Sequence, residues 1–173
     1  MTVITISGKA QAGKDTTAKL LKEKLTKIGC SVLITHYADL LKYQAQTLFG
    51  WDGKKDEAGR TLLQKLGTDI VRKKNPDYWV EYVSNMLRIY EDQWDYVLIP
   101  DARFPNEIVT MQLLHSAISL RVNSDYDNGL TEEQKNHPSE TALDDFVFDY
   151  EIYNDRTEEG LNKAVDEFLK SIL

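Results

Sequence analysis

The chain has 173 residues, of which 42% are apolar and 28% charged, and its formal net charge is −7. These values predict one globular domain over residues 1–173, and they exclude a basic nucleic-acid-binding surface and a membrane-spanning run of about 18 apolar residues. Cys30 is the only cysteine, which excludes an intrachain disulfide and a cysteine-based metal site, so we expect a cytoplasmic protein without nucleic-acid or membrane partners.

Strands and helices are predicted to alternate along most of the chain. Apolar runs predict five strands, over residues 2–7, 31–37, 96–100, 117–122 and 149–153. Helical spacing of apolar residues predicts six helices, over residues 14–28, 38–49, 59–74, 77–91, 106–115 and 158–172. Residues 51–58 read as a loop, and residues 123–145 as a long irregular segment of the kind that forms a functional lid. Strands separated by helices indicate an α/β protein with a parallel sheet covered on both faces.

The segment Gly8–Thr16 (GKAQAGKDT), called the phosphate loop below, lies between the first predicted strand and the first predicted helix. It matches G-x-x-x-x-G-K, in which backbone N–H groups surround a phosphate and the lysine adds a positive charge. The helix that follows points the positive end of its dipole at the same place. Asp15 stands where Ser or Thr usually ligates Mg²⁺. The alternative interpretation is a tight turn with a solvated lysine.

Polar side chains also follow the second and third predicted strands. In an open parallel sheet the ligand lies beyond the carboxyl ends of the strands, where residues 36–42 and 101–103 are expected. Asp101 is predicted to hold Mg²⁺ or to orient a substrate, and its alternative role is the N-cap of the helix that follows. Arg103 offers paired donors to a phosphate. Together they predict a metal or hydroxyl contact beside a clamp for the transition state.

Several residues elsewhere have both a functional and a structural interpretation. Gly67 costs about 1 kcal/mol against alanine in a helix, which indicates close approach of a ligand or of another backbone. Arg60 is either a substrate contact or a solvated helix residue, and Trp79 either stacks on a base or packs in the core. His137 and Ser139 (in HPSE, 137–140) would suit a hydrolase, but no strand-turn-helix nucleophile elbow surrounds Ser139.

Seven blocks of sequence, in order along the chain, carry a family resemblance. They are GKAQAGKDTT, ADLLK (38–42), LLQKLGTD (62–69), YWV (78–80), PDARFPNE (100–107), HPSE (137–140) and YNDRTEEGL (153–161). Together they resemble the deoxynucleoside monophosphate kinases of tailed bacteriophages. The resemblance implies a P-loop fold of the NMP-kinase type, with a five-stranded parallel sheet, an NMP-binding helical region at about residues 38–92 and a lid at about residues 123–145. It implies transfer of the γ-phosphoryl group of ATP, with Mg²⁺, to a small-molecule substrate, a deoxynucleoside monophosphate, and a possible homodimer.

The resemblance also implies roles for individual residues. ATP is expected to contact Gly8, Ala10, Ala12, Gly13, Lys14, Asp15, Thr16 and Thr17 through its phosphates, and Asn154 and Asp155 near the adenine. The acceptor is expected to contact Lys42, Arg60, Gly67, Thr68, Trp79, Asp101, Arg103, Glu107 and Arg121. Lys14, Asp101 and Arg103 are the expected catalytic residues, and Asp15 and Thr16 the expected Mg²⁺ ligands. Because residues 123–145 contain no arginine, Arg103, Arg121 and Lys14 are expected to supply the positive charge that a lid arginine gives in many such kinases.

Three alternatives to a deoxynucleoside monophosphate kinase remain at this point. One is another small-molecule kinase of the same fold, such as a dephospho-coenzyme-A kinase or a nucleoside kinase. The second is a nucleotide-binding switch or regulatory ATPase without an acceptor, and the third is a structural protein that retains the loop. The predicted helix with Arg60, Gly67 and Thr68 favours an acceptor site, which a switch does not need.

Overall fold

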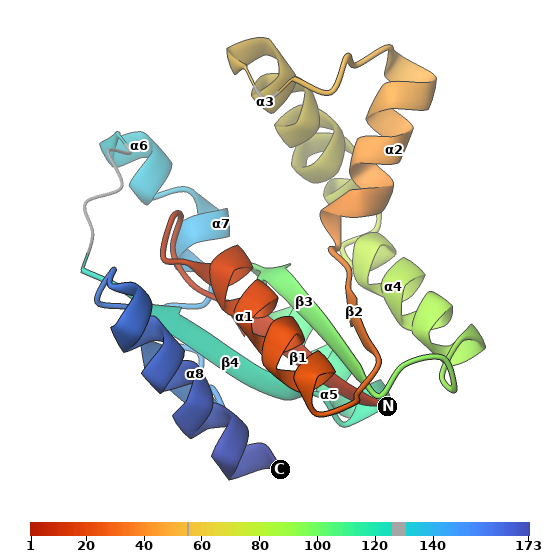
Figure 1. Ribbon diagram of the computed structural model, residues 1–173. Helices are drawn as coiled ribbons and strands as arrows, with labels where there is room; N and C mark the ends of the chain where they lie inside the picture. Colours follow the sequence, from red (N-terminus) through yellow and green to blue (C-terminus); the bar gives the residue numbers. More distant parts are fainter. Residues whose placement is uncertain (55, 126–130) are drawn as a thin grey trace.

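The computed structural model describes residues 1–54, 56–125 and 131–173, without the side chains of residues 133 and 134. Its centre is a five-stranded parallel sheet in the order β2-β3-β1-β4-β5 (Figure 1). The strands are β1 (Thr2–Ser7), β2 (Val32–Ile34), β3 (Tyr96–Ala102), β4 (Ile118–Asn123) and β5 (Tyr150–Tyr153). This confirms the predicted five-stranded parallel sheet.

Helices cover both faces of the sheet. Successive side chains of the central strand point to opposite faces, and since apolar residues lie on both faces, each face needs to be covered. Ile4 and Ile6 of β1 pack in one core with α1 (Lys14–Lys27) and α8 (Glu158–Ile172). Val3 packs in the other core with α4 (Tyr78–Ile89) and α5 (Pro105–His115). Figure 1 shows α1 and α8 on the near side of the sheet.

The remaining helices lie at the end of the sheet where the parallel strands end. On one side are α2 (Ala38–Phe49), α3 (Glu57–Gln64) and the π-helix η1 (Lys65–Arg72), and on the other are the short helices α6 (Glu132–Lys135) and α7 (Pro138–Thr141) (Figure 1). The phosphate loop lies at this same end, since it follows β1. Among the described residues, no helix has both the length and the apolar character that crossing a membrane requires.

Two strands differ in length from the prediction. The strand expected over residues 31–37 pairs only over Val32–Ile34, because it lies at the sheet edge and the backbone N–H of His36 already donates to Asp39 Oδ2 (2.9 Å) in the turn that starts α2. The strand expected over residues 96–100 continues to Ala102, which pairs with Ser7 after a shift in register. The other strands lie within one or two residues of the expected ranges.

The single helix expected over residues 59–74 was wrong in two respects. It begins earlier, at Glu57, because the Asp56 side chain accepts a hydrogen bond from Gly59 N (2.8 Å) and caps it, so residues 57 and 58 are not part of a loop. From Lys65 it continues as a π-helix. The segment expected to be irregular over residues 123–145 contains α6 and α7, and residues 126–130 of the expected lid lie outside the described residues.

Candidate active site

The phosphate loop is held in shape by glycines and by a side chain from the far end of the chain. Gly13 has a φ of 103°, a conformation that favours glycine, and a Cβ there would lie 2.3 Å from Asn154 Nδ2. Asn154, buried just after β5, donates to the carbonyl of Ala12 (2.9 Å). The residue expected near the adenine therefore supports the backbone that surrounds the phosphates. Asp155 accepts from Thr157 N (2.9 Å) just before α8, and Thr157 itself caps that helix by accepting from Gly160 N.

Lys14 is buried at the start of α1, inside the phosphate loop. Its Nζ donates to the carbonyls of Gly8 (2.8 Å) and Lys9 (2.9 Å), so the ammonium group is surrounded by the loop's own backbone. Burial, followed by the nearby positive charge of Arg103, lowers the pKa of Lys14 to about 8. The loop therefore contains a cation whose charge is sensitive to a neighbouring anion.

This pKa leads to a prediction about proton uptake. A polyphosphate in the loop favours charged Lys14 and raises its pKa above about 8, so ATP binding at pH 8 is expected to take up part of a proton. Affinity for ATP should accordingly fall as the pH rises through 8. Calorimetry at pH 8 in two buffers of different ionisation enthalpy measures the uptake, and the Lys14→Met variant, which cannot titrate there, is the control. Identical heats in both buffers for the unmodified protein would contradict the prediction.

Two further residues of the first turn of α1 offer oxygen atoms to a nucleotide. Thr17 is buried, and its hydroxyl has no hydrogen-bond partner among the residues that the structure describes. An unpaired buried hydroxyl is unfavourable, so a phosphate oxygen in the loop would satisfy it. The Asp15 side chain is 73% exposed, and its Oδ1 lies 3.5 Å from His36 Nε2. It faces the start of α2, beside the loop.

The oxygen donors of this turn fit a magnesium ion that is shared with a nucleotide. Mg²⁺ in such sites usually takes one or two protein oxygens and completes its shell with phosphates and waters. Asp15 and Thr16 are adjacent, exposed oxygen donors beside Lys14. In the described part of the chain, no group of three or more His, Cys, Asp or Glu residues could hold a metal by itself. Asp15 and Thr16 therefore stay the predicted ligands.

A cavity of about 150 Å³, called the acceptor pocket below, lies between α2, η1, α4 and the end of β3. Aromatic and aliphatic side chains form most of its wall. The residues without a charged or hydrogen-bonding side chain, or with an aromatic one, are Tyr37, Ala38, Leu41, Leu63, Gly67, Trp79 and Phe104, and the polar ones are Thr68, Arg72, Asp101, Arg103, Glu107 and Ser139. It has the composition typical of a small-molecule site, with an apolar wall and a few converging polar groups.

The π-helix places its residues against this pocket. A Cβ on Gly67 would lie 2.7 Å from Leu41 Cδ2, so glycine permits the close approach of α2 to η1. The close neighbour is therefore a side chain rather than a ligand or another backbone. Trp79 is buried, and its Nε1 donates to the Gly67 carbonyl (3.2 Å). Short π-helical segments are frequent at functional sites, and this one presents Thr68 and Arg72 to the pocket.

Glu107, at the start of α5, organises the polar end of the pocket. It is buried and accepts hydrogen bonds from Arg72 Nη2, from Arg103 N (2.7 Å) and from Phe104 N (3.1 Å). Burial raises the pKa of Glu107, while the Arg72 guanidinium opposes that rise. The Arg72 guanidinium also lies 4.3 Å from the centre of the Phe104 ring. Glu107 and Phe104 thus fix the orientation of Arg72.

Sequence analysis did not single out Arg72, which lies near the end of the helix predicted over residues 59–74. Its position four residues after Thr68, on a helix interrupted by Gly67, is the signal that could have found it.

Asp101 is bound to the backbone of α2. Its two carboxylate oxygens accept from Tyr37 N and Ala38 N, each at 3.0 Å, and burial raises its pKa. The alternative role as the N-cap of the helix that follows was wrong, because the N-cap of α5 is Phe104 and the Asp101 carboxylate accepts instead from backbone N–H groups at the start of α2. Its predicted catalytic and metal-binding roles stay predictions, and its observed contacts join β3 to α2 at the pocket.

Arg103 lies between the acceptor pocket and the phosphate loop. Its Nη1 donates to Glu140 Oε1 (2.6 Å) and to the Ser139 carbonyl (3.3 Å) in α7. The other carboxylate oxygen of Glu140 accepts from Ala10 N of the phosphate loop (2.7 Å). Glu140 is a second residue that sequence analysis did not assign to the site, since its contacts with Ala10 and Arg103 join residues that are 130 and 37 positions apart.

The other predicted site residues are distributed around this centre. Arg121 is buried, donates to Ser7 Oγ (3.1 Å) and lies 3.7 Å from Asp144 Oδ1, close to the start of the phosphate loop but outside the pocket. Lys42 is paired with Asp39 (3.0 Å), and Arg60 lies on the exposed side of α3. The structure does not bring Lys42 or Arg60 into the acceptor pocket, so their contact with an acceptor stays a prediction.

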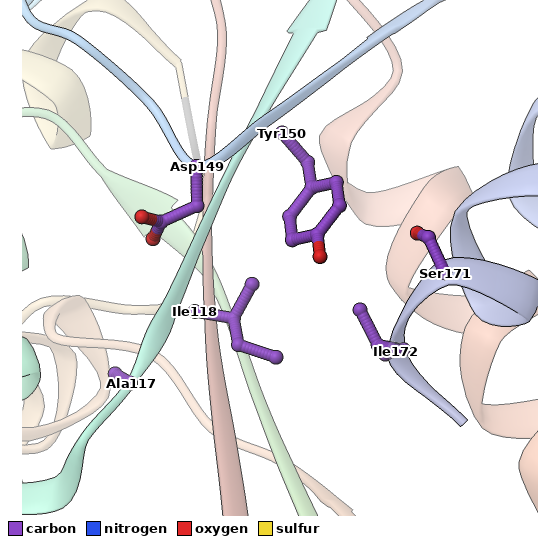
Figure 2. Close-up of a pocket in the computed structure, with 6 residues that line it drawn as sticks. All are labelled: Ala117, Ile118, Asp149, Tyr150, Ser171 and Ile172. Atoms are coloured by element: carbon purple, nitrogen blue, oxygen red, sulfur yellow. The ribbon is translucent and has the colours of Figure 1, made fainter.

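A second hollow lies at the opposite end of the sheet (Figure 2). It is formed where β4 and β5 begin and α8 ends, and Tyr150 and Ile118 point into it while Ile172 closes one side. The Asp149 carboxylate beside it is bound to Ser119, accepting from both its N and its Oγ (2.8 Å each). The wall of this hollow contains neither the phosphate loop nor an arginine. We therefore take the acceptor pocket, and not this hollow, as the candidate active site.

A family model described as deoxynucleotide monophosphate kinase matches residues 35–165, about three quarters of the chain. The chain belongs to this family. The match begins after the phosphate loop, so the loop and the family match are separate observations that agree. It confirms the predicted kinase family, while an origin in tailed bacteriophages stays a prediction.

Individual proteins of known sequence or structure also resemble the chain. Phosphomevalonate kinase of Drosophila melanogaster is 26% identical over 183 residues, which cover 98% of this chain and 95% of that protein. Thymidylate kinase from Ehrlichia chaffeensis superposes with a TM-score of 0.57 at 16% identity, covering 99% of this chain and 98% of the other. The Mycobacterium tuberculosis APS kinase CysC, solved with AMPPNP and APS, gives 0.57 at 13% identity, with 99% and 96% coverage. At these identities the solved structures show the P-loop kinase fold, and together with the family match they identify a nucleotide or small-molecule kinase.

Proposed function

We propose that the protein transfers the γ-phosphoryl group of ATP to a deoxynucleoside monophosphate, giving ADP and a deoxynucleoside diphosphate. The observation that carries this proposal is the position of Arg103. It lines the acceptor pocket and, through Glu140, is linked to the backbone N–H of Ala10 in the phosphate loop. A guanidinium between two phosphate-binding regions suits a phosphoryl group that passes from one region to the other.

On the donor side, the backbone of the phosphate loop and Lys14 bind the phosphates of ATP. The buried Thr17 hydroxyl adds one more donor. Mg²⁺, held through Asp15 and Thr16 when bound, neutralises charge on the phosphate oxygens. These groups act by position and charge, because phosphoryl transfer to a phosphate oxygen needs little covalent chemistry from the protein.

On the acceptor side, the pocket supplies an aromatic wall and a fixed arginine. Arg72 is held by Glu107 and Phe104, so its orientation is set before the acceptor binds. A planar guanidinium offers paired N–H donors to the acceptor phosphate, and Arg103 lies beside it. The aromatic wall of Tyr37, Trp79 and Phe104 suits a planar base. This combination favours a nucleoside monophosphate over a small aliphatic acceptor.

Release of ADP, measured with a coupled assay on adding each NMP and dNMP in turn, tests this proposal. We expect release that depends on the acceptor and is faster with at least one dNMP than with the matching NMP. Release that ignores every acceptor would favour the alternative of a switch or regulatory ATPase, and absence of both nucleotide binding and ADP release would favour a structural protein.

A second candidate is a kinase for a phosphorylated acceptor without a base. The observation that favours it is the similarity to phosphomevalonate kinase, which extends over 98% of this chain. The same assay therefore includes phosphomevalonate, dephospho-coenzyme A and the free nucleosides. Faster ADP release with any of these than with every dNMP would replace the first proposal by this one. Base preference, the homodimer and the cytoplasmic location stay predictions.

The predicted role of Asp15 leads to a test of metal dependence. A carboxylate about 4 Å from a phosphate oxygen is repelled by about 4 kcal/mol at an effective dielectric of 20, so Asp15 is expected to face Mg²⁺, directly or through water. Asp15→Asn should raise the Mg²⁺ concentration for half-maximal activity about tenfold while ATP binding without metal changes little. Glu23→Gln, a loss of one exposed carboxylate on the same helix, is the control. An unchanged Mg²⁺ titration of Asp15→Asn would refute the role.

A further inference from the structure

Each carboxylate oxygen of Glu140 accepts a hydrogen bond from a group that could also bind a phosphate. Its Oε2 accepts from Ala10 N of the phosphate loop (2.7 Å), and its Oε1 accepts from Arg103 Nη1 (2.6 Å). The Glu140 side chain is only 8% exposed. A loop amide and a guanidinium together form the surroundings expected for a phosphate group.

Further contacts attach α7 to the phosphate loop at this point. Lys9 Nζ donates to the backbone carbonyl of Glu140 (2.6 Å) and pairs with the Asp144 carboxylate. On the other side, His137 Nε2 lies 3.0 Å from Gln64 Nε2 of α3. Residues 137–144, which include α7, therefore contact both the phosphate loop and α3, and Glu140 lies within this segment.

We propose that Glu140 is an internal substitute for the terminal phosphate of ATP, which must displace it in order to bind. This inference rests on the proposed function, because it assumes that the phosphate loop binds ATP. While Ala10 N and Arg103 donate to Glu140, they cannot donate to a phosphate oxygen. The carboxylate and the phosphate therefore compete for the same donors. ADP, which lacks the terminal phosphate, leaves Glu140 in place.

The competition gives Glu140 a role in discrimination and in product release. Once the phosphoryl group has moved to the acceptor and the product has left, the carboxylate returns to Ala10 N and Arg103. ATP therefore binds more weakly than it would to a phosphate loop without Glu140. The affinity for ADP is the same with and without Glu140. Glu140 thus sets the ratio of ATP affinity to ADP affinity.

Direct binding of ATP and of ADP, each with Mg²⁺ and without acceptor, tests the inference by calorimetry on the full chain. Glu140→Gln, which keeps the shape but removes the charge, should bind ATP about tenfold more tightly than the unmodified protein, the effect of losing one charge-assisted contact to the competing carboxylate. Its affinity for ADP should stay the same. Asp145→Asn removes one charge from an exposed carboxylate five residues away and should change neither affinity.

Three results would overturn the inference. These are unchanged ATP affinity in Glu140→Gln, weaker ATP binding as expected if Glu140 only positions Arg103, or an equal gain for ATP and ADP that Asp145→Asn reproduces. Glu140→Ala, checked by thermal melting beside Glu140→Gln, provides a second variant in case the first does not fold. If the unmodified protein binds no ATP, the proposed kinase function fails together with the inference about Glu140. If it binds ATP and one of the three results above is found, the inference about Glu140 alone fails.

Discussion

Replacing Lys14 with alanine is expected to lower kcat by about 10²–10³-fold, the loss typical of removing one preorganised charge or donor at the reacting group. Lys14 lies inside the phosphate loop, where its ammonium is bound by the carbonyls of Gly8 and Lys9. Because Lys14 is buried within the loop, its ammonium is held at a fixed position, which an alanine would leave empty. The steady-state rate of ADP release at saturating ATP and acceptor measures the effect.

The fold should survive this replacement, because in the part of the chain that the structure describes the hydrogen bonds of Lys14 Nζ stay within the phosphate loop. Far-UV circular dichroism and thermal melting check this. Lys19→Ala removes an exposed lysine from the same helix and should leave the rate unchanged. Near-normal turnover in Lys14→Ala would show that the loop does not bind the transferred group.

The Arg103→Lys replacement is expected to lower kcat by at least about 10²-fold, although it keeps the positive charge. A lysine presents one compact charge on a flexible stem, whereas the Arg103 guanidinium is planar and contacts both Glu140 and the carbonyl of Ser139. A point charge can neither reproduce the paired donors nor bridge the pocket and the phosphate loop at once.

The comparison that isolates this effect is Arg88→Lys, the same change at an exposed position of α4 far from the pocket. It should leave kcat and the KM values of both substrates unchanged. An Arg103→Lys enzyme with normal kcat and a raised KM for the acceptor would instead place Arg103 in binding alone, outside the transition state.

Local sequence patterns were enough to predict the five strands of the sheet and the position of the phosphate loop. The apolar runs located all five strands, because a buried parallel strand is apolar on both faces, and G-x-x-x-x-G-K between a strand and a helix located the donor site. The shortening of β2 could not be predicted, since it depends on the hydrogen bond between His36 and Asp39 and on the position of β2 at the sheet edge.

The acceptor side depends on contacts between distant residues, which a single sequence does not reveal. Arg72 is paired with Glu107, 35 positions later, and Asp101 caps a helix that begins 63 positions earlier, at Ala38. Glu140 reaches the phosphate loop over 130 positions. The π-helix was also hidden, because over eight residues the apolar spacing of a π-helix and of an α-helix is too similar to separate.

In the proposed reaction, one phosphoryl group passes from the phosphate loop to the acceptor pocket past Arg103. Incubation with ATP labelled in its γ-phosphate and with each dNMP, followed by separation of the products, tests it most directly. We expect the label to appear in a deoxynucleoside diphosphate, in an amount equal to the ADP formed. Label that appears only as inorganic phosphate, or that stays in ATP with every dNMP, would show that no such transfer takes place.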